Sequence, residues 1–334
     1  MAAALTAGGA FIAGCSVKDA LQKNGGDTME IIEGDPKIDG KVDGRVYLLR
    51  TNDRRNNARE LIEKFNLNEL ENERVAVKAN FNSMDSFPGT THPDMLRTIL
   101  EAVKSKTDDI VIAERSGMGK TSDVLTKLGI ADIAGEMGIE IINLERHKRW
   151  IRFNADHWLR GFLFADIFYD ADHVIQTCCL KTHRFGGHFT MSLKNSVGMI
   201  AKRIRFYDYM AELHLSPNQR KMIAEINIAY TPFLIILDAI EGFSEGGPDK
   251  GRLIKPKLLI AGKDRVAVDA VGVALLRIYG TTPEVSRGSV FDQEQIKRAA
   301  ELGIGVSSPE EIDLVPLNRD AEGVAGRIMK ELLA

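Results

Sequence analysis

The chain has 334 residues, of which 44% are hydrophobic and 27% are charged, and this balance excludes a disordered protein and allows one large domain or two lobes. Its net charge of −3 excludes a general nucleic-acid binder, because phosphate contacts require a broadly basic surface. We therefore expect a folded protein that has no nucleic-acid partner.

An apolar, small-residue stretch at the start of the chain predicts export. The sequence ALTAGGAFIAGC, residues 4–15, ends like the lipobox of bacterial lipoproteins, in which the cysteine is lipidated. The run is shorter than the about 20 apolar residues of a transmembrane helix. We expect residues 1–15 to be a signal peptide with lipidated Cys15, and the protein to be anchored to the outer face of the cytoplasmic membrane or held in the periplasm. A cytoplasmic protein with an apolar arm is the alternative, since no Lys or Arg precedes the run.

The next segment, residues 16–43, is polar and contains Gly25-Gly26, so it predicts a tether that packs no core. We expect the folded domain to occupy residues 44–334.

Short β-branched apolar runs within that domain predict strands at residues 45–51, 74–81, 109–114, 139–145, 173–180, 233–240 and 256–262. Amphipathic patterns predict helices at residues 93–106 and 293–303, the second ending on Gly303. Apolar strands that alternate with amphipathic helices are typical of an α/β fold with a mostly parallel sheet and helices on both faces. We expect two lobes, residues 44–170 and 171–334, with a cleft between them.

Ligands of such sheets bind beyond the carboxyl ends of the strands, so the loops there are candidate sites. After residues 74–81, the sequence TTHPD predicts a capped helix start whose free backbone N–H groups point toward the end of the strand. The candidate ligand-binding residues here are Lys78, Asn80, Thr91 and His92. For His92, a role in the helix cap alone remains the alternative.

The loop after residues 109–114 resembles a phosphate-binding P-loop, because Gly119-Lys120-Thr121 ends it. That motif requires a glycine where this chain has Glu114, and a carboxylate there would oppose phosphate. We therefore rank a P-loop NTPase below the other functions, and we expect Lys120 to be solvated. The candidate ligand-binding residues of this loop are Glu114, Ser116 and Gly117.

The segment KTHRFGGHFTMSLKN, residues 181–195, is strongly basic. No acidic residue occurs between Asp172 and Asp208, so a local positive field predicts an anionic partner. Lysines inside apolar runs such as MSLKNSVGMI must find a carboxylate or a ligand. The candidate ligand-binding residues are Lys181, Thr182, Arg184 and Asn195, and the candidate catalytic residues are His183, His188 and Lys194. His183 and His188 are also candidate metal ligands. We expect Lys202, Arg203 and Arg205 to be solvated.

Cys178 and Cys179 are adjacent and have two open interpretations, buried strand residues or a soft metal site completed by His183. Without a C-x-x-C or four-cysteine spacing, the chain itself predicts no iron–sulfur cluster. Among the carboxylates, Asp238 ends a strand and is the better site candidate, whereas Asp264 is expected to cap a helix and Asp269 to form a salt bridge.

Several sequence blocks, in this order, resemble the bacterial and archaeal family called domain of unknown function 362. They are VKANF, THPD, ERSG, LKTHRFGGHFTMSLKNSVG, LDAIEG, GKDRVAVDAVG and AELGIG, within residues 44–315. Many relatives carry a ferredoxin-like cysteine cluster and a twin-arginine signal, and this sequence shows neither. The resemblance implies a fold and a site but no reaction.

The chain also resembles, more faintly, the nickel-pincer lactate racemases. The resemblance lies in the order of the elements along the chain: strands, a glycine turn and, later, a His followed by Gly-Gly and a Lys. It implies that His183, His188 and Lys194 lie near a metal-bearing cofactor and a small hydroxy acid. The glycine turn departs from that family because it continues GMGK and lacks the expected histidine.

The sequence thus predicts an exported, lipid-anchored α/β protein with a basic cleft for a small anion. A metal-assisted enzyme acting on an organic acid or phosphate is one interpretation, and a solute-binding or redox-accessory module without catalysis is the other. The cofactor is left open, with a divalent metal as one hypothesis, and the oligomeric state is not assigned.

Overall fold

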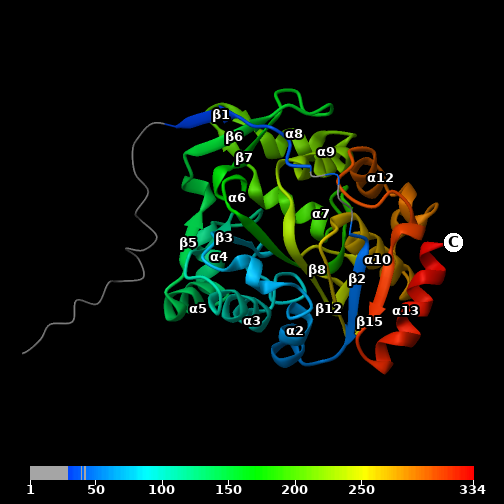
Figure 1. Ribbon diagram of the computed structural model, residues 1–334. Coiled ribbons are helices and arrows are strands. Elements are labelled where there is room, and N and C mark those ends of the chain that lie inside the picture. The colour runs from blue at the N-terminus through cyan, green and yellow to red at the C-terminus, as the bar shows by residue number, and fades with distance from the viewer. Residues whose placement is uncertain (1–28, 39, 41–42) are drawn as a thin grey trace, which may run out of the picture.

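The computed structural model describes residues 29–38, 40 and 43–334 (Figure 1). The predicted signal peptide with Cys15, and residues 16–28 of the predicted tether, lie outside these residues. Within the described part of the chain, no helix has the length and apolar character needed to cross a membrane.

A ten-stranded sheet forms the centre of the fold, with its main path in the order β15-β2-β14-β12-β8-β3-β4-β5. The neighbours along this path are parallel, except that β14 runs antiparallel to both β2 and β12. The strands on the path are β2 (Arg45–Arg50), β3 (Val75–Lys78), β4 (Ile110–Glu114), β5 (Glu140–Asn143), β8 (His173–His183), β12 (Pro232–Gly246), β14 (Leu258–Gly262) and β15 (Asp313–Pro316). The short strands β9 (His188–Phe189) and β13 (Gly251–Ile254) pair with β8 and β12. The predicted, mostly parallel sheet is confirmed.

Helices cover both faces of this sheet (Figure 1). One face carries α2 (Arg54–Ile62), α3 (Pro93–Lys104), α4 (Thr121–Lys127) and α5 (Ile130–Met137). The other face carries α10 (Arg265–Ile278), α12 (Glu294–Glu301) and α13 (Arg319–Leu332). Beside them lie α8 (Tyr209–Leu215), α9 (Gln219–Ile226) and a three-stranded sheet of β1 (Glu30–Glu33), β6 (Arg149–Phe153) and β7 (Phe162–Ala165). The remaining elements include α6 (Asp166–Tyr169), α7 (Ser192–Asn195), α11 (Pro283–Ser286), β10 (Arg203–Ile204) and β11 (Tyr207–Asp208).

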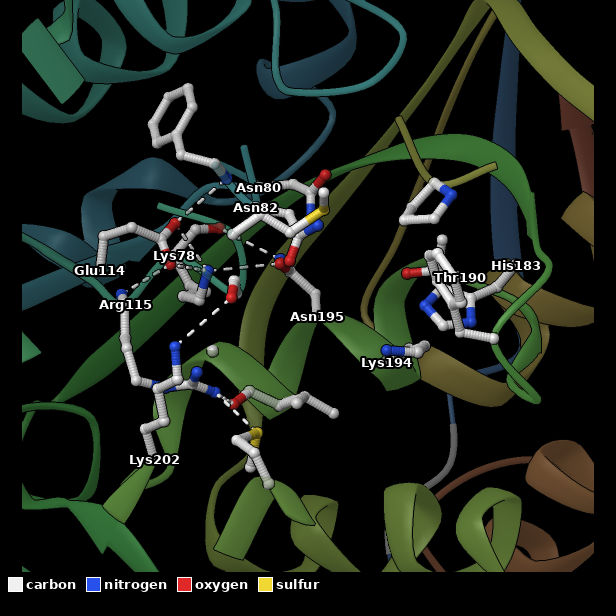
Figure 2. A pocket seen from close by; sticks show the side chains of 18 of the residues that line it. Lys78, Asn80, Asn82, Glu114, Arg115, His183, Thr190, Lys194, Asn195 and Lys202 are labelled. Atoms are coloured by element: carbon white, nitrogen blue, oxygen red, sulfur yellow. Dashed lines mark hydrogen bonds and ion pairs between the residues drawn. The ribbon is translucent and has the colours of Figure 1, made fainter. Parts of the chain in front are cut away.

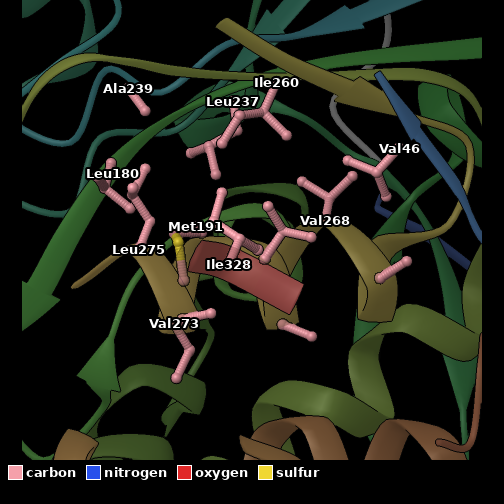
Figure 3. Packing of buried hydrophobic residues seen from close by; sticks show 14 of the residues in the cluster. Val46, Leu180, Met191, Leu237, Ala239, Ile260, Val268, Val273, Leu275 and Ile328 are labelled. Atoms are coloured by element: carbon pink, nitrogen blue, oxygen red, sulfur yellow. The ribbon is translucent and has the colours of Figure 1, made fainter. Parts of the chain in front are cut away.

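The alternation of side chains along each strand divides the core into layers. In β2, Val46 and Leu48 pack against α10 and α13, whereas Leu49 faces the α2 and α3 side. Figure 3 shows strand residues such as Leu237 and Ile260 packed around Val268 of α10. Successive strand residues point to opposite faces, so strands covered on both sides must be apolar throughout, as the sequence indicates.

The domain organisation differs from the prediction in two respects. Regular structure also occurs before residue 44, because β1 lies within the predicted tether and pairs in parallel with β6 over four residues. The two predicted lobes are not confirmed: β2, from the first predicted lobe, pairs with β14 and β15 of the second, so one sheet joins both halves.

The predicted cap of α10 is confirmed and gives a test of the fold. Asp264 Oδ1 accepts hydrogen bonds from Val266 N (2.7 Å) and Ala267 N (2.9 Å), and its Oδ2 accepts from Val306 N (2.7 Å). Since Asp264 is buried, Asp264→Ala leaves these donors unsatisfied and should lower the free energy of unfolding by about 2 kcal/mol. Denaturant titration followed by circular dichroism measures this. The exposed cap variant Asp53→Ala is the control, and an equal loss in both variants would contradict the account.

Candidate functional site

A cavity of about 540 Å³ lies where β3, β4 and β8 end. These neighbouring parallel strands bring their carboxyl ends to one edge of the sheet, and α7 and α8 also contribute side chains to the wall of the cavity, some of which Figure 2 shows. Its lining residues are Lys78, Asn80, Phe81, Asn82, Glu114, Arg115, Gly117, Met118, Lys181, His183, Phe185, Thr190, Lys194, Asn195, Val197, Gly198, Lys202, Met210, His214 and Pro248.

A buried ion pair joins the ends of β3 and β4. Lys78 Nζ lies 2.8 Å from both carboxylate oxygens of Glu114, and each side chain is 2% exposed. Glu114 also accepts hydrogen bonds from the backbone N–H groups of Arg115 (2.8 Å) and Phe81 (3.3 Å). Burial lowers the pKa of Lys78, and the charge of Glu114 opposes that shift. Both charges of the pair are therefore compensated within the protein.

Gly198 leaves the space that this ion pair occupies. A Cβ at Gly198 would lie 2.7 Å from Lys78 Cε and 3.1 Å from Glu114 Oε1. Lys78 Nζ also donates a weak hydrogen bond to Asn195 Oδ1 at 3.4 Å, which connects the pair to α7.

Lys181, near the end of β8, is buried, and no carboxylate in the described part of the chain forms an ion pair with it. Its Nζ donates hydrogen bonds to Asn80 Oδ1 (2.8 Å) and to the carbonyl oxygen of Gly89. Burial lowers the pKa of this amine. Thr91 supports the arrangement from behind, because its Oγ1 accepts a hydrogen bond from Asn80 N at 2.9 Å.

Lys194 is held by α7 and faces the cavity (Figure 2). The carboxylate of Asp269, on α10, accepts hydrogen bonds from the backbone N–H groups of Ser192 (2.8 Å) and Leu193 (3.0 Å), and so fixes the start of α7. Lys194 is 9% exposed, and its amine has no hydrogen-bond or ion-pair partner among the described residues. Burial lowers the pKa of Lys194 to about 8, and the charges of Lys181 and Arg115 act in the same direction.

Two imidazoles line the cavity in opposite tautomeric arrangements. Nδ1 of His183 accepts a hydrogen bond from Gly187 N at 3.3 Å, so the neutral ring carries its proton on Nε2. Nδ1 of His214 lies 2.7 Å from the carbonyl oxygen of Met210, so Nδ1 must donate and Nε2 keeps a free lone pair. Burial lowers the pKa of both groups, that of His183 well below its ordinary value.

Arg115 and Lys202 add positive charge to the wall of the cavity. Arg115 is buried, and its guanidinium donates hydrogen bonds to the carbonyl oxygens of Ile200 (2.9 Å) and Val197. Burial lowers the pKa of Arg115 to about 10, which keeps it charged at neutral pH. Lys202 is exposed, and its Nζ lies 3.5 Å from the carbonyl oxygen of Gly117.

The charges of the cavity wall do not balance. The five cationic side chains Lys78, Arg115, Lys181, Lys194 and Lys202 face a single carboxylate, that of Glu114. Glu114 is already bonded to Lys78, so the other cations have no anion in the wall. Uncompensated charge in a largely buried site is costly, and a bound anion would remove that cost.

The sequence-predicted candidates divide into two groups. Those that line the cavity are Lys78, Asn80, Glu114, Gly117, Lys181, His183, Lys194 and Asn195. The others lie outside its wall: Thr91, His92, Ser116, Thr182, Arg184, His188 and Asp238. His92 caps α3, and Ser116 and Thr182 donate to the backbone carbonyls of Phe81 and Phe243.

The charged members of the second group form ion pairs away from the cavity. Asp238 is paired with Arg54 at 2.6 Å, so its carboxylate is compensated by a residue far along the sequence. Arg184 is paired with Asp249 at 2.6 Å. Asp269, expected in a salt bridge, instead binds backbone N–H groups.

His183 and His188 do not share the cavity. They are register partners of β8 and β9, but His188 has a left-handed backbone (φ +62°) and does not line the cavity. The charged groups near His188 are Arg220, Glu284, Glu294 and Arg287. Among the described residues, no group of three or more His, Cys, Asp or Glu side chains is arranged to hold a metal ion. Cys178 and Cys179 are buried and unbridged.

Sequence reasoning missed Arg115, Thr190, Met210 and His214, and it expected the cavity residue Lys202 to be only solvated. Arg115 directly follows Glu114, so it belongs to a loop at the carboxyl end of a strand, where the sequence analysis expected ligand-binding residues. Met210 and His214 belong to α8, which reaches the cavity only through tertiary packing. The P-loop hypothesis gains no support, because Glu114 is bonded to Lys78 and the exposed Lys120 does not line the cavity.

Comparison with known proteins identifies a family. Residues 75–274 match the family described as "Domain of unknown function (DUF362)", which is more than half of the chain. The chain therefore belongs to this family, and the resemblance seen in its sequence blocks is confirmed. The comparison with curated proteins found no significant match.

Among solved structures, the chain is similar to the lactate racemase apoprotein from Thermoanaerobacterium thermosaccharolyticum. The two are 14% identical in sequence with a TM-score of 0.43. The match covers 74% of this chain and 62% of the racemase chain, so this chain spans less than two thirds of that protein.

The buried pair of Lys78 and Glu114 predicts strong coupling between the two residues. Lys78→Met or Glu114→Gln alone leaves one buried charge without its partner and should lower the free energy of unfolding by about 3–5 kcal/mol. The double variant removes both charges and should lose less than the sum of the single losses. Denaturant titrations of all four proteins measure the coupling, and strictly additive losses would contradict the ion pair.

Proposed function

We propose that this member of the DUF362 family binds a small organic anion, a carboxylate or a phosphate, in the cavity at the ends of β3, β4 and β8. The observation that carries the proposal is the charge of the wall, in which five cationic side chains face one carboxylate. A volume of about 540 Å³ is in the range of small-molecule sites.

Three buried cations of the wall, Lys181, Lys194 and Arg115, are not neutralised by Glu114, and they favour the binding of an anion. Burial lowers the pKa of Lys194, and the charges of Lys181 and Arg115 lower it further. An anion placed near them would stabilise all three charges at once. Lys194 is the best direct contact, because its amine has no partner among the described residues.

The two imidazoles in the cavity wall support a catalytic role for the site. His183 can donate a hydrogen bond through Nε2–H, and His214 can accept a proton at Nε2, so a ligand that contacts both would meet a hydrogen-bond donor and a general base near neutral pH. We therefore propose an enzyme that acts on a small organic acid or phosphate. A solute-binding module needs the cations but not the imidazoles, so loss of turnover without loss of binding in His214→Gln separates the two.

The side chains that line the cavity do not fit the hypothesis of a divalent metal cofactor. His183, His214 and Glu114 line the cavity, but the described residues contain no cluster of three such ligands, and Glu114 is bonded to Lys78. We therefore assign no step to a metal, and total metal analysis of the purified protein tests the hypothesis directly.

Replacement of Lys194 tests the anion site. Lys194→Met should weaken binding of oxalate, malonate or phosphate, whichever binds the wild type, by about 1.5–3 kcal/mol, the range for charged hydrogen bonds. The empty variant should be as stable as the wild type or more stable, because a buried and unpartnered charge is removed. Isothermal titration calorimetry measures the affinity, and differential scanning calorimetry measures the melting temperature.

Lys104→Met is the control for this experiment, because Lys104 is paired with Asp108 on the surface of α3, at 2.9 Å. It should change neither quantity measurably. If Lys194→Met melts well below the wild type without ligand, Lys194 is a structural residue and the anion site is wrong.

We also propose, from the lipobox-like sequence, that the protein is exported and lipid-anchored through Cys15. In a bacterial host, the full-length protein should partition into detergent, and Cys15→Ser should abolish both cleavage and partitioning. Cys178→Ser is the control, since this cysteine is buried in β8 and should leave partitioning unchanged. Equal soluble behaviour of the wild type and Cys15→Ser would remove the anchor from the proposal.

A further inference from the structure

Lys194 differs from the other lysines that line the cavity. Lys78 is bonded to Glu114, Lys181 to Asn80 and Gly89, and Lys202 is exposed to solvent. Lys194 alone among these four is both buried and without a partner among the described residues. A lysine amine in such surroundings is the type that serves as a nucleophile, because burial and neighbouring cations favour its neutral form.

The surroundings hold this amine in place. Two backbone N–H groups of α7 are bonded to Asp269, which fixes the helix turn that carries Lys194. Gly187 packs directly against the side chain, since a Cβ there would lie 2.9 Å from Lys194 Cε and 2.9 Å from His183 Nδ1. The Cε end of Lys194 and the His183 ring therefore both lie next to Gly187 in the wall (Figure 2).

We propose that Lys194 Nζ is a covalent nucleophile that forms an imine with the carbonyl carbon of a 2-oxo acid bound in the cavity. The proposal rests on the proposed function, because the carboxylate of the oxo acid would bind the other cations of the anion site, such as Lys181, while the neutral form of Lys194 attacks the carbonyl group. Beyond the proposed function, it specifies that the ligand contains a reactive carbonyl group and that the site forms a covalent bond with it.

The step is balanced without any further reactant. The lone pair of Nζ adds to the carbonyl carbon, and one proton passes from Nζ to the former carbonyl oxygen to give a carbinolamine. A second proton passes from Nζ to the hydroxyl group, which leaves as water while the C=N bond forms. His214, whose Nε2 has a free lone pair, can take each proton from Nζ and deliver it to the oxygen, and His183 Nε2–H can donate a hydrogen bond to that oxygen.

The pKa of Lys194, lowered by burial to about 8, supports this chemistry. At pH 8 about half of the Lys194 amines are neutral, whereas an ordinary lysine with a pKa of about 10.4 is neutral in less than about 1% of molecules. The proposed reaction should therefore be fast at Lys194 and should rise with pH through about 8.

Reductive trapping tests the proposal. The full chain is incubated with pyruvate and sodium cyanoborohydride at pH 8, and the adducts are located by peptide mass mapping. We expect one reduced pyruvate adduct at Lys194, formed at least about tenfold faster than any adduct at Lys202, and excess oxalate should slow it. The adduct should disappear in Lys194→Arg and persist in Lys104→Met, because Lys104 is paired with Asp108 on the surface and does not line the cavity.

Oxalate binding, measured on the same proteins, separates the two proposals. Oxalate cannot form an imine, so the wild type should bind it even if the covalent proposal is wrong. Lys194→Arg keeps the positive charge and should retain oxalate binding within about tenfold while losing the adduct. Oxalate binding without any Lys194 adduct, or an adduct mainly at Lys181 or Lys202, overturns the nucleophile. Absence of oxalate, malonate and phosphate binding in the wild type overturns the anion site itself.

Discussion

The buried ion pair of Lys78 and Glu114 is the interaction on which the cavity depends. It joins the ends of two parallel strands, and Glu114 also binds two backbone N–H groups of the loops that follow them. Because the pair uses the one carboxylate of the wall, the described cavity wall contains no further anion for Lys181, Lys194 and Arg115. The same contact that stabilises the strand ends thus makes the site positive.

A second constraint comes from α10, on the face of the sheet that packs against α13. Asp269 is buried in that helix and binds the start of α7, and burial raises the pKa of its carboxyl group to about 7 against the effect of these two donors. The position of Lys194 is therefore set by the core and not by a surface loop. Rigid support of this kind is what a binding or reacting amine requires.

The sequence predicted the fold where local patterns decide it. The apolar runs placed the strands of the main sheet, and the apolar context of Lys194 indicated that this lysine needs a ligand. Pairings between distant segments were not predictable: Asp238 is paired with Arg54, 184 positions away, and β1 adds to β6 although its own sequence resembles a tether. Met210 and His214 reach the cavity through the packing of α8, for which the sequence contains no local signal.

The central claim is that the cavity binds an anion at the charged form of Lys194. Binding should then raise the pKa of Lys194 from about 8, so calorimetry in buffers of different ionisation enthalpy should detect proton uptake. The account predicts an uptake of about half a proton per bound oxalate at pH 8, close to none at pH 6, and none in Lys194→Met. Binding without proton uptake at pH 8, or with the same uptake in Lys194→Met, would contradict it.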